Sequence, residues 1–183
     1  NKMLKKRQLP GIDSKKYKEI FDFPVTKYYI KLGFDFSREP FEELTVEFIG
    51  EYYRRFNECK LFSRTEELLK KIKDMGISQS ILSASKEDVL LEKIKYYGID
   101  RYFCKIIGLD NHYAESKIER GKNWISGLKI DPQEVLLIGD TIHDYDVSKH
   151  IGGDCLLIAS GHNSYERLVK LDVDIVRSLE DII

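Results

Sequence analysis

The chain has 183 residues, of which 42% are hydrophobic and 33% charged, and its formal net charge is -1. This composition is typical of a globular protein with one sizeable core, and the interspersed charges argue against a broad basic face for nucleic acid. No apolar run approaches the ~20 residues that span a bilayer, and three cysteines without a CxxC pair favour the cytoplasm over a disulfide-forming compartment.

The N-terminal part of the chain is predicted to be helical and contains no convincing strand. Leu9-Pro10-Gly11 and Gly33 separate helix-like stretches in which Tyr and Phe are frequent. We therefore predict a small all-α domain over residues 1–60, with a linker at residues 57–62, and expect the aromatic side chains to form its core. The helices are predicted at residues 2–8, 14–21, 25–32 and 40–56.

From Ser63 onward, short apolar runs alternate with amphipathic stretches, and the connections between them are short. Repeated βα units of this kind predict a parallel sheet with right-handed crossovers and helices on both faces. The predicted fold class is thus α/β, with a Rossmann-like three-layer core over residues 61–183. The strands are predicted at residues 77–84, 103–109, 135–138, 155–159 and 175–176, and the helices from Ser63, from Ser85 and at residues 118–128, 144–151 and 165–171.

Two of these helices begin with an N-cap signal. Ser63-Arg64-Thr65-Glu66 has the spacing of a capping box, with the acid three residues after the serine. Ser85, followed by Asp88 three residues later, has the same spacing. In each case we expect the serine side chain to accept a hydrogen bond from the first turn of the helix.

The most informative feature is the sequence Ile138-Gly139-Asp140-Thr141, followed by Asp144. The apolar run at residues 136–138 predicts a buried parallel strand that ends at Gly139. That strand would deliver both carboxylates to the carboxyl edge of the sheet, where open α/β proteins bind their ligands. Two carboxylates at such an edge suit a hard cation such as Mg²⁺. The alternative is a helix N-cap followed by a solvated acid.

Two further polar residues are expected near the same edge. Ser83 follows the apolar pair Ile81-Leu82 at the end of a predicted strand, and Lys117 opens a predicted helix. Taken singly, Ser83 would be a turn residue and Lys117 a solvated side chain. Together with the carboxylates, a hydroxyl and an ammonium at one sheet edge can bind a phosphoryl group and a divalent cation.

These residues occur in the order of three known motifs. Ile81-Leu82-Ser83-Ala84-Ser85 looks like the first of them, Lys117 fits the second, and Gly139-Asp140-Thr141-Ile142-His143-Asp144 fits the third. On these motifs the chain resembles the haloacid dehalogenase-like superfamily, in particular its phosphoglycolate-phosphatase-like members with a helical cap. The resemblance covers essentially the whole chain. It implies a Mg²⁺-dependent phosphatase that acts on a small phosphorylated metabolite, as a monomer or homodimer, without a nucleic-acid or membrane partner.

The resemblance also implies a role for each residue. Asp140 would hold Mg²⁺ jointly with the nucleophile, and Asp144 would orient the water shell of the metal or pair with Lys117. The Lys117 ammonium, the Ser83 hydroxyl and the backbone N–H of Ala84 would bind the oxygens of the phosphoryl group. We thus predict Ser83, Lys117 and Asp144 as catalytic residues, Ser83, Ala84 and Lys117 as phosphate-binding residues, and Asp140 and Asp144 as metal ligands.

One family motif has no counterpart in the chain. It is an apolar strand followed by Asp-x-Asp-x-Thr, which in the family supplies the aspartate nucleophile, the general acid and one Mg²⁺ ligand. Asn1-Lys2-Met3-Leu4 resembles the middle of the first cap helix. The missing motif is therefore expected upstream of Asn1.

Two alternatives to the phosphatase stay open. The chain could be an inactive relative that binds a phosphorylated ligand or a protein partner, or a phosphomutase with the same type of cap. A nucleotide-binding domain is disfavoured because no strand is followed by a GxGxxG or GxxxxGK loop.

Overall fold

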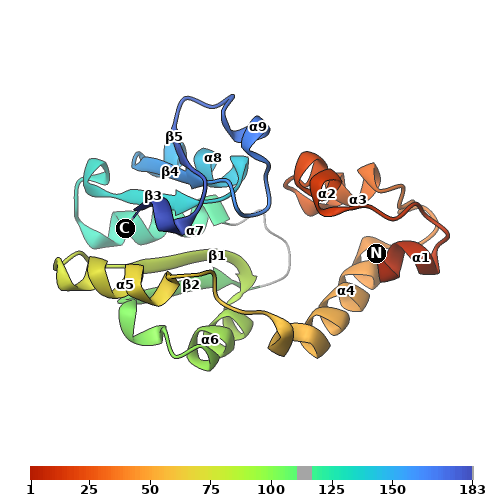
Figure 1. The fold of residues 1–183 in the computed structure, drawn as a ribbon, viewed down its shortest axis with the longest axis horizontal. Helices are drawn as coiled ribbons and strands as arrows, with labels where there is room; N and C mark the ends of the chain where they lie inside the picture. The colour runs from red at the N-terminus through yellow and green to blue at the C-terminus, as the bar shows by residue number, and fades with distance from the viewer. Residues whose placement is uncertain (111–116, 183) are drawn as a thin grey trace.

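The structure, a computed structural model, describes residues 1–110 and 117–182. Figure 1 shows the N-terminal helices on one side and the α/β part on the other, with the chain passing between them after α4. The helices are α1 (Lys2–Lys6), α2 (Ser14–Ile20), α3 (Val25–Lys31), α4 (Phe41–Arg55), α5 (Thr65–Asp74), α6 (Glu87–Tyr96), α7 (Lys117–Leu128), α8 (Ile142–Ile151) and α9 (Tyr165–Leu168), with 3-10 turns η1 (Phe56–Glu58), η2 (Asp100–Tyr102), η4 (Pro132–Glu134) and η5 (Leu179–Ile182). The strands are β1 (Ser80–Lys86), β2 (Lys105–Leu109), β3 (Leu136–Gly139), β4 (Asp154–Ile158) and β5 (Asp174–Val176).

The predicted α/β fold class is confirmed, because the described strands pair in parallel and alternate with helices along the chain. The strands form two sheets, with the orders β1-β2 and β3-β4-β5. β3 is an edge strand, and its side chains Leu136 and Ile138 are 56% and 39% exposed. The parallel sheet that the sequence predicts is thus divided into two halves, and the prediction that the strand at residues 136–138 is buried is wrong. β1 and β3 each have one unpaired edge within the described chain.

Helices α7 and α8 join the two halves. α7 packs against β1, β2 and α8, and α8 packs against β3 and β4. At Gly121 of α7 an added methyl group would lie 3.0 Å from Leu82 of β1 and 3.3 Å from Ile151 of α8. The absence of a side chain at Gly121 therefore lets one helix touch both halves of the core.

The N-terminal helices have a separate core. Leu4, Tyr29, Phe34 and Leu44 form its buried cluster, and partly buried aromatic residues pack around it. These aromatic residues therefore serve mainly as core, as the sequence suggests. The boundary predicted at residue 60 falls between η1 and α5, and the division into two domains stays a prediction.

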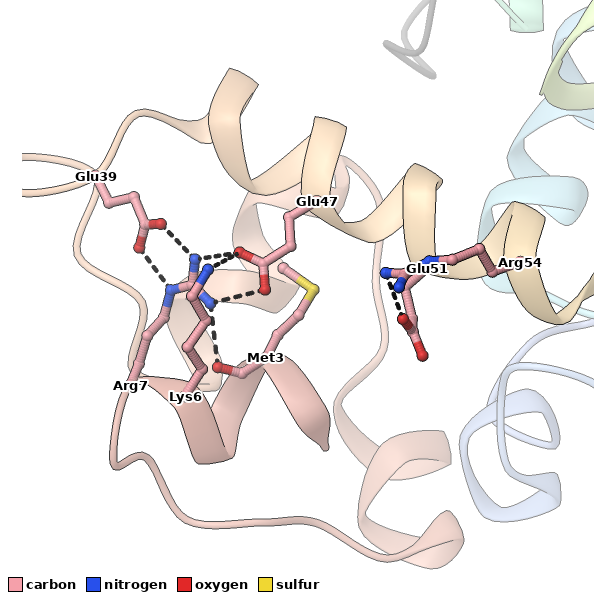
Figure 2. Close-up of polar contacts among 7 residues, drawn as sticks. All are labelled: Met3, Lys6, Arg7, Glu39, Glu47, Glu51 and Arg54. Carbon is pink, nitrogen blue, oxygen red and sulfur yellow. Dashed lines mark hydrogen bonds and ion pairs between the residues drawn. The ribbon is translucent and has the colours of Figure 1, made fainter.

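Arg7 links three segments of this helical part, as Figure 2 shows. Its guanidinium pairs with Glu39, donates to Glu47 of α4 at 2.8 Å and donates to the backbone carbonyl of Met3 at 3.2 Å. It also lies 5.5 Å from the centre of the Phe34 ring. Hydrogen bonds from Arg7 lower the pKa of Glu47 to about 2. The ionised form of Glu47 is therefore favoured in the folded state.

We expect Glu47→Gln to reduce stability near neutral pH by about 1 kcal/mol, the usual size of a charged hydrogen bond that is partly exposed. Since folding lowers the pKa of Glu47 from 4.5 to about 2, its contribution is fully present above pH 4.5 and is lost as the pH falls towards 2. Urea unfolding of both proteins at several pH values measures this difference. The matched control is Glu67→Gln, which removes the exposed Arg64–Glu67 pair. A difference that persists at pH 2 would contradict the prediction.

The two predicted N-cap signals are wrong. Helix α5 begins at Thr65 after Arg64, whose φ of 59° is left-handed, and Thr65 Oγ1 donates to the Phe62 carbonyl at 2.8 Å. At the second site, pairing with β2 extends β1 to Lys86, so α6 starts at Glu87 and Ser85 lies within the strand. Tertiary pairing and a local turn thus override the capping spacing in both places.

Candidate active site

The loop after β3 folds back on itself through Asp144. Oδ2 of Asp144 accepts hydrogen bonds from the backbone N–H of Asp140 at 3.1 Å, the N–H of Thr141 at 3.0 Å and the Thr141 hydroxyl at 2.7 Å. In return, the N–H of Asp144 donates to Thr141 Oγ1 at 3.1 Å, which completes a capping box at the start of α8. Gly139 is required here, because an added methyl group would lie 2.3 Å from Cβ of Asp144.

Lys117 supplies the counter-charge to Asp144. Its Nζ lies 2.5 Å from Oδ1 of Asp144, and the two residues are only 9% and 5% exposed. Burial alone would raise the pKa of Asp144, but the charge and hydrogen bond of Lys117, together with the loop donors, hold this pKa below its usual value. The site therefore contains a buried and oriented ion pair.

This pairing bears on the roles predicted for Asp144. Both of its oxygens are occupied by four donors from Lys117, Asp140 and Thr141. Asp144 is thus the partner that holds Lys117 in this structure, and its role as a metal ligand stays a prediction. The alternative of a solvated acid is wrong, because Asp144 is buried.

Asp140 is arranged differently from Asp144. Its Oδ2 accepts the backbone N–H of His162 at 2.6 Å, and an added methyl group at Gly161 would lie 2.0 Å from the same oxygen. Within residues 1–110 and 117–182, no hydrogen bond or ion pair to Oδ1 of Asp140 is found. Asp140 therefore has one carboxylate oxygen available to a cation.

The donor set fits Mg²⁺ with one protein carboxylate. The described residues contain no group of three or more His, Cys, Asp or Glu side chains that could hold a metal ion. Mg²⁺ is commonly bound by one or two carboxylates, with water and substrate phosphate completing its shell. Asp140 can provide one such ligand, and a second would come from a residue outside the described chain or from the substrate.

Ser83 and Ala84 lie in an irregular part of β1. The register with β2 runs from Leu82 opposite Ile107 to Lys86 opposite Leu109, so residues 83–85 form a bulge. The Ser83 hydroxyl accepts the N–H of Ser85 at 3.1 Å. Bulges of this kind redirect side chains and free backbone groups from the ladder. Ser83 and Ala84 come from the sheet that contacts α7, whose first residue is Lys117.

Three residues beside this loop make contacts that the sequence does not predict: His143, Tyr17 and His162. His143 lies in the first turn of α8, with its ring 4.9 Å from that of Phe23, and its buried Nε2 has no hydrogen-bond partner in the described chain. Burial and the charge of Lys117 lower the pKa of His143. Burial also raises the pKa of Tyr17, whose hydroxyl lies 2.5 Å from Nδ1 of His162. No local pattern predicts these contacts, because the partners are distant in sequence.

None of the helices in the part of the chain that the structure describes is both long enough and apolar enough to cross a membrane.

Relatives of known type match the chain at low identity. A phosphoglycolate phosphatase of Vibrio vulnificus is 23% identical over 117 residues, which are 63% of this chain and 51% of that protein. The PpaX pyrophosphatase of Anoxybacillus flavithermus is 24% identical over 147 residues, 75% of this chain and 68% of that protein. The tyrosine-protein kinase PtkA of Mycobacterium tuberculosis is 22% identical over 140 residues, 75% of this chain and 48% of that protein. The chain spans about half the length of most of the curated relatives it matches.

Solved structures confirm the fold. A haloacid dehalogenase-like hydrolase from Bacteroides fragilis superposes with a TM-score of 0.82 at 24% identity, over 100% of this chain and 88% of that one. The protein tyrosine kinase A of Mycobacterium tuberculosis superposes with a TM-score of 0.78 at 20% identity, over 98% of this chain and 84% of that one. The family profile described as haloacid dehalogenase-like hydrolase matches residues 1–158. With the fold, the motifs and this profile in agreement, the chain belongs to the haloacid dehalogenase-like hydrolase family.

Proposed function

We propose that this protein is a Mg²⁺-dependent phosphatase that hydrolyses a small phosphomonoester through an aspartyl-phosphate, with its nucleophilic aspartate upstream of residue 1. The observation that carries the proposal is the buried Lys117–Asp144 pair beside Asp140, whose Oδ1 has no hydrogen-bond partner among the described residues. In this proposal residues 1–60 act as a cap over the core at residues 61–183, and the protein works in the cytoplasm as a monomer or homodimer.

Lys117 would stabilise the transferring phosphoryl group. An ammonium has three N–H donors, of which Asp144 takes one, and within the described residues the other two are available to phosphoryl oxygens. Because Asp144 fixes the position of Nζ in advance, little reorganisation is needed when negative charge develops. Asp144 would thus serve catalysis by positioning Lys117.

Ser83 and Ala84 would donate hydrogen bonds to the same group. The bulge leaves residues 83–85 without register partners on β2. The hydroxyl of Ser83 and the backbone N–H of Ala84 can then turn towards an anion, which is the kind of oriented neutral donor that phosphoryl transfer uses.

Asp140 would hold Mg²⁺ through Oδ1, while the N–H of His162 keeps Oδ2 in place. When bound, Mg²⁺ would neutralise charge on the phosphate and polarise one of its oxygens. Asp140 itself would fix the cation at the carboxyl end of β3, next to the ammonium of Lys117.

The divided sheet supports a nucleophile on an additional strand. β1 and β3 each have an unpaired edge in the described chain, and alternate side chains of β3 are exposed. Unpaired edges are unfavourable, and a strand placed between β1 and β3 would pair with both of them. If parallel to its neighbours, it would end at the same edge as Asp140 and could present a carboxylate there.

A protein extended through the upstream motif tests the proposal. We expect it to hydrolyse p-nitrophenyl phosphate only when Mg²⁺ is present, and we expect Asp140→Asn to raise the Mg²⁺ concentration needed for half-maximal rate by about tenfold or more, since one charged ligand is lost. Asp146→Asn, at an acid of the following helix α8 without a predicted role, is the matched control. Full activity of Asp140→Asn at low Mg²⁺ would contradict the assignment.

The alternatives give different results in the same assay. A phosphomutase would return the phosphoryl group from the enzyme to its product instead of releasing inorganic phosphate. An inactive binding module would release no phosphate and would bind Mg²⁺ weakly even with the upstream motif present.

A further inference from the structure

Residues 161–164, here called the bridge, contact the loop at residues 139–144. The side-chain Oδ1 of Asn163 accepts the backbone N–H of Ile142 at 2.9 Å. The N–H of Asn163 donates to the Asp140 carbonyl at 3.3 Å, and the N–H of His162 donates to Oδ2 of Asp140 at 2.6 Å. The bridge therefore fixes both the backbone and the carboxylate of Asp140.

The bridge also contacts the C-terminal end of α2 in the N-terminal helices. Nδ2 of Asn163 donates to the Phe21 carbonyl at 3.1 Å, and the N–H of Ser164 donates to the Lys18 carbonyl at 3.3 Å. Arg167 of α9 donates to the same two carbonyls. The last carbonyls of a helix lack intrahelical donors, so these bonds satisfy groups that would otherwise need water.

An aromatic contact strengthens this attachment. The rings of Phe21 and His162 are stacked, with centroids 4.7 Å apart and planes at 23°. Tyr17 of α2 reaches Nδ1 of the same His162 ring. One side of His162 thus faces α2, while its backbone N–H holds Asp140.

We propose that Asn163 is a positioning residue that couples the docking of α2 to the geometry of the Asp140 loop. Asn163 is 2% exposed, and its single side-chain amide makes both contacts. The amide oxygen accepts the N–H of Ile142, and the amide nitrogen donates to the Phe21 carbonyl. Rotation of the amide by half a turn would place N–H against N–H and oxygen against oxygen, so only one orientation of the amide makes both bonds. The role of Asp140 in this coupling depends on the proposed function, whereas the coupling itself does not.

If α2 moved away from the bridge, the hydrogen bonds that hold the loop at residues 139–144 would change. This movement would leave Nδ2 of Asn163 without an acceptor and would remove the stacking of Phe21 on His162. A buried donor without a partner is unfavourable, so the amide would seek another arrangement and release the N–H of Ile142. By reciprocity, a ligand that orders the loop would favour the docked position of α2.

Three substitutions distinguish the contact of the bridge with α2 from its contact with the loop at residues 139–144. Arg167→Gln removes donors to the Phe21 and Lys18 carbonyls but touches no residue of the loop. Asn163→Asp keeps an acceptor for Ile142 and loses the donor to Phe21, whereas Asn163→Ala loses both. The matched control is Tyr97→Phe, which removes a hydrogen bond of 2.9 Å to the Cys59 carbonyl, at the other end of the N-terminal helices.

Hydrogen exchange of the protein as it stands measures the coupling without any need for activity. We expect Arg167→Gln to speed amide exchange at residues 18–21 and also at residues 139–144 by about three- to tenfold, the factor for one or two lost hydrogen bonds. Asn163→Asp is expected to speed exchange in the same two segments. Asn163→Ala is expected to speed exchange at residues 139–144 more than either of these variants. Tyr97→Phe is expected to leave the exchange rate at residues 139–144 unchanged. Arg167 is less buried than Asn163, with 17% of its side chain exposed, so Arg167→Gln is expected to keep the fold even if the Asn163 variants do not.

The proposal is overturned if Arg167→Gln speeds exchange at residues 18–21 while residues 139–144 keep the wild-type rate. It is also overturned if neither segment responds, or if Tyr97→Phe affects the loop equally. A second measurement uses Mn²⁺ as a probe of Asp140, with weaker Mn²⁺ binding expected in Asn163→Ala. If the protein extended through the upstream motif binds no Mn²⁺ but the exchange pattern is as expected, the proposed function fails and the coupling stands.

Discussion

Replacing Lys117 with alanine should lower turnover by about a hundredfold or more, because removal of one preorganised donor to a developing charge costs roughly 3–4 kcal/mol. Lys117 is buried, and its Nζ is held 2.5 Å from Asp144. No solvent molecule can supply an equally fixed positive charge at that point. The measurement is kcat and KM for p-nitrophenyl phosphate hydrolysis in the protein extended through the proposed upstream segment, with kcat carrying most of the loss.

Two comparisons make this result specific. Lys122 lies further along α7 and is exposed, with its Nζ 3.4 Å from Glu119, so Lys122→Ala should retain the wild-type rate. Lys117→Arg keeps the charge but not the compact ammonium, and is expected to recover only part of the rate. A Lys117→Ala protein with most of its turnover would remove Lys117 from the mechanism.

The second large effect is expected on stability. Asp144→Ala should lower the free energy of unfolding by about 3–5 kcal/mol, the range for removing one member of a buried ion pair. The substitution leaves Lys117 as an unpaired buried charge and removes the acceptor of the Thr141 hydroxyl. It also removes the capping box that starts α8. Urea unfolding followed by circular dichroism measures the change.

The control and the double variant identify the cause. Asp154→Ala, at an exposed acid of β4, should change stability little. Asp144→Ala combined with Lys117→Met removes the unpaired charge and should be more stable than Asp144→Ala alone. If the double variant is no more stable, then the lost capping bonds and not the buried charge explain the effect.

The strongest sequence signals were those in which one local pattern dictates the structure. The apolar run before Gly139 predicted the strand that delivers Asp140, and β3 ends at Gly139. The alternation after residue 63 predicted the parallel α/β fold, which the family match confirms. Lys117 opens α7, as the sequence predicts. These features depend on periodicity and chain order, which are present in the sequence itself.

Boundaries and caps were less predictable. Ser63 and Ser85 have N-cap spacing, but a left-handed residue at Arg64 and the pairing of Lys86 with Leu109 move both helix starts. A short capping motif contributes about 1 kcal/mol. Pairing of a strand with its neighbour can outweigh this contribution, and no local pattern reveals it.

Only the tertiary structure decided what the site residues contact. Sequence order predicts that Asp140, Asp144 and Lys117 share one edge of the sheet, but it leaves open whether Asp144 binds metal or pairs with Lys117. In the structure, hydrogen-bond donors occupy both carboxylate oxygens of Asp144, whereas Oδ1 of Asp140 has no partner within the described chain. Asn163 meets the Phe21 carbonyl across 142 positions of sequence. Such contacts arise when separate helices and loops pack together, so the chain fixes its local elements in advance, whereas the partners of each side chain depend on the assembled fold.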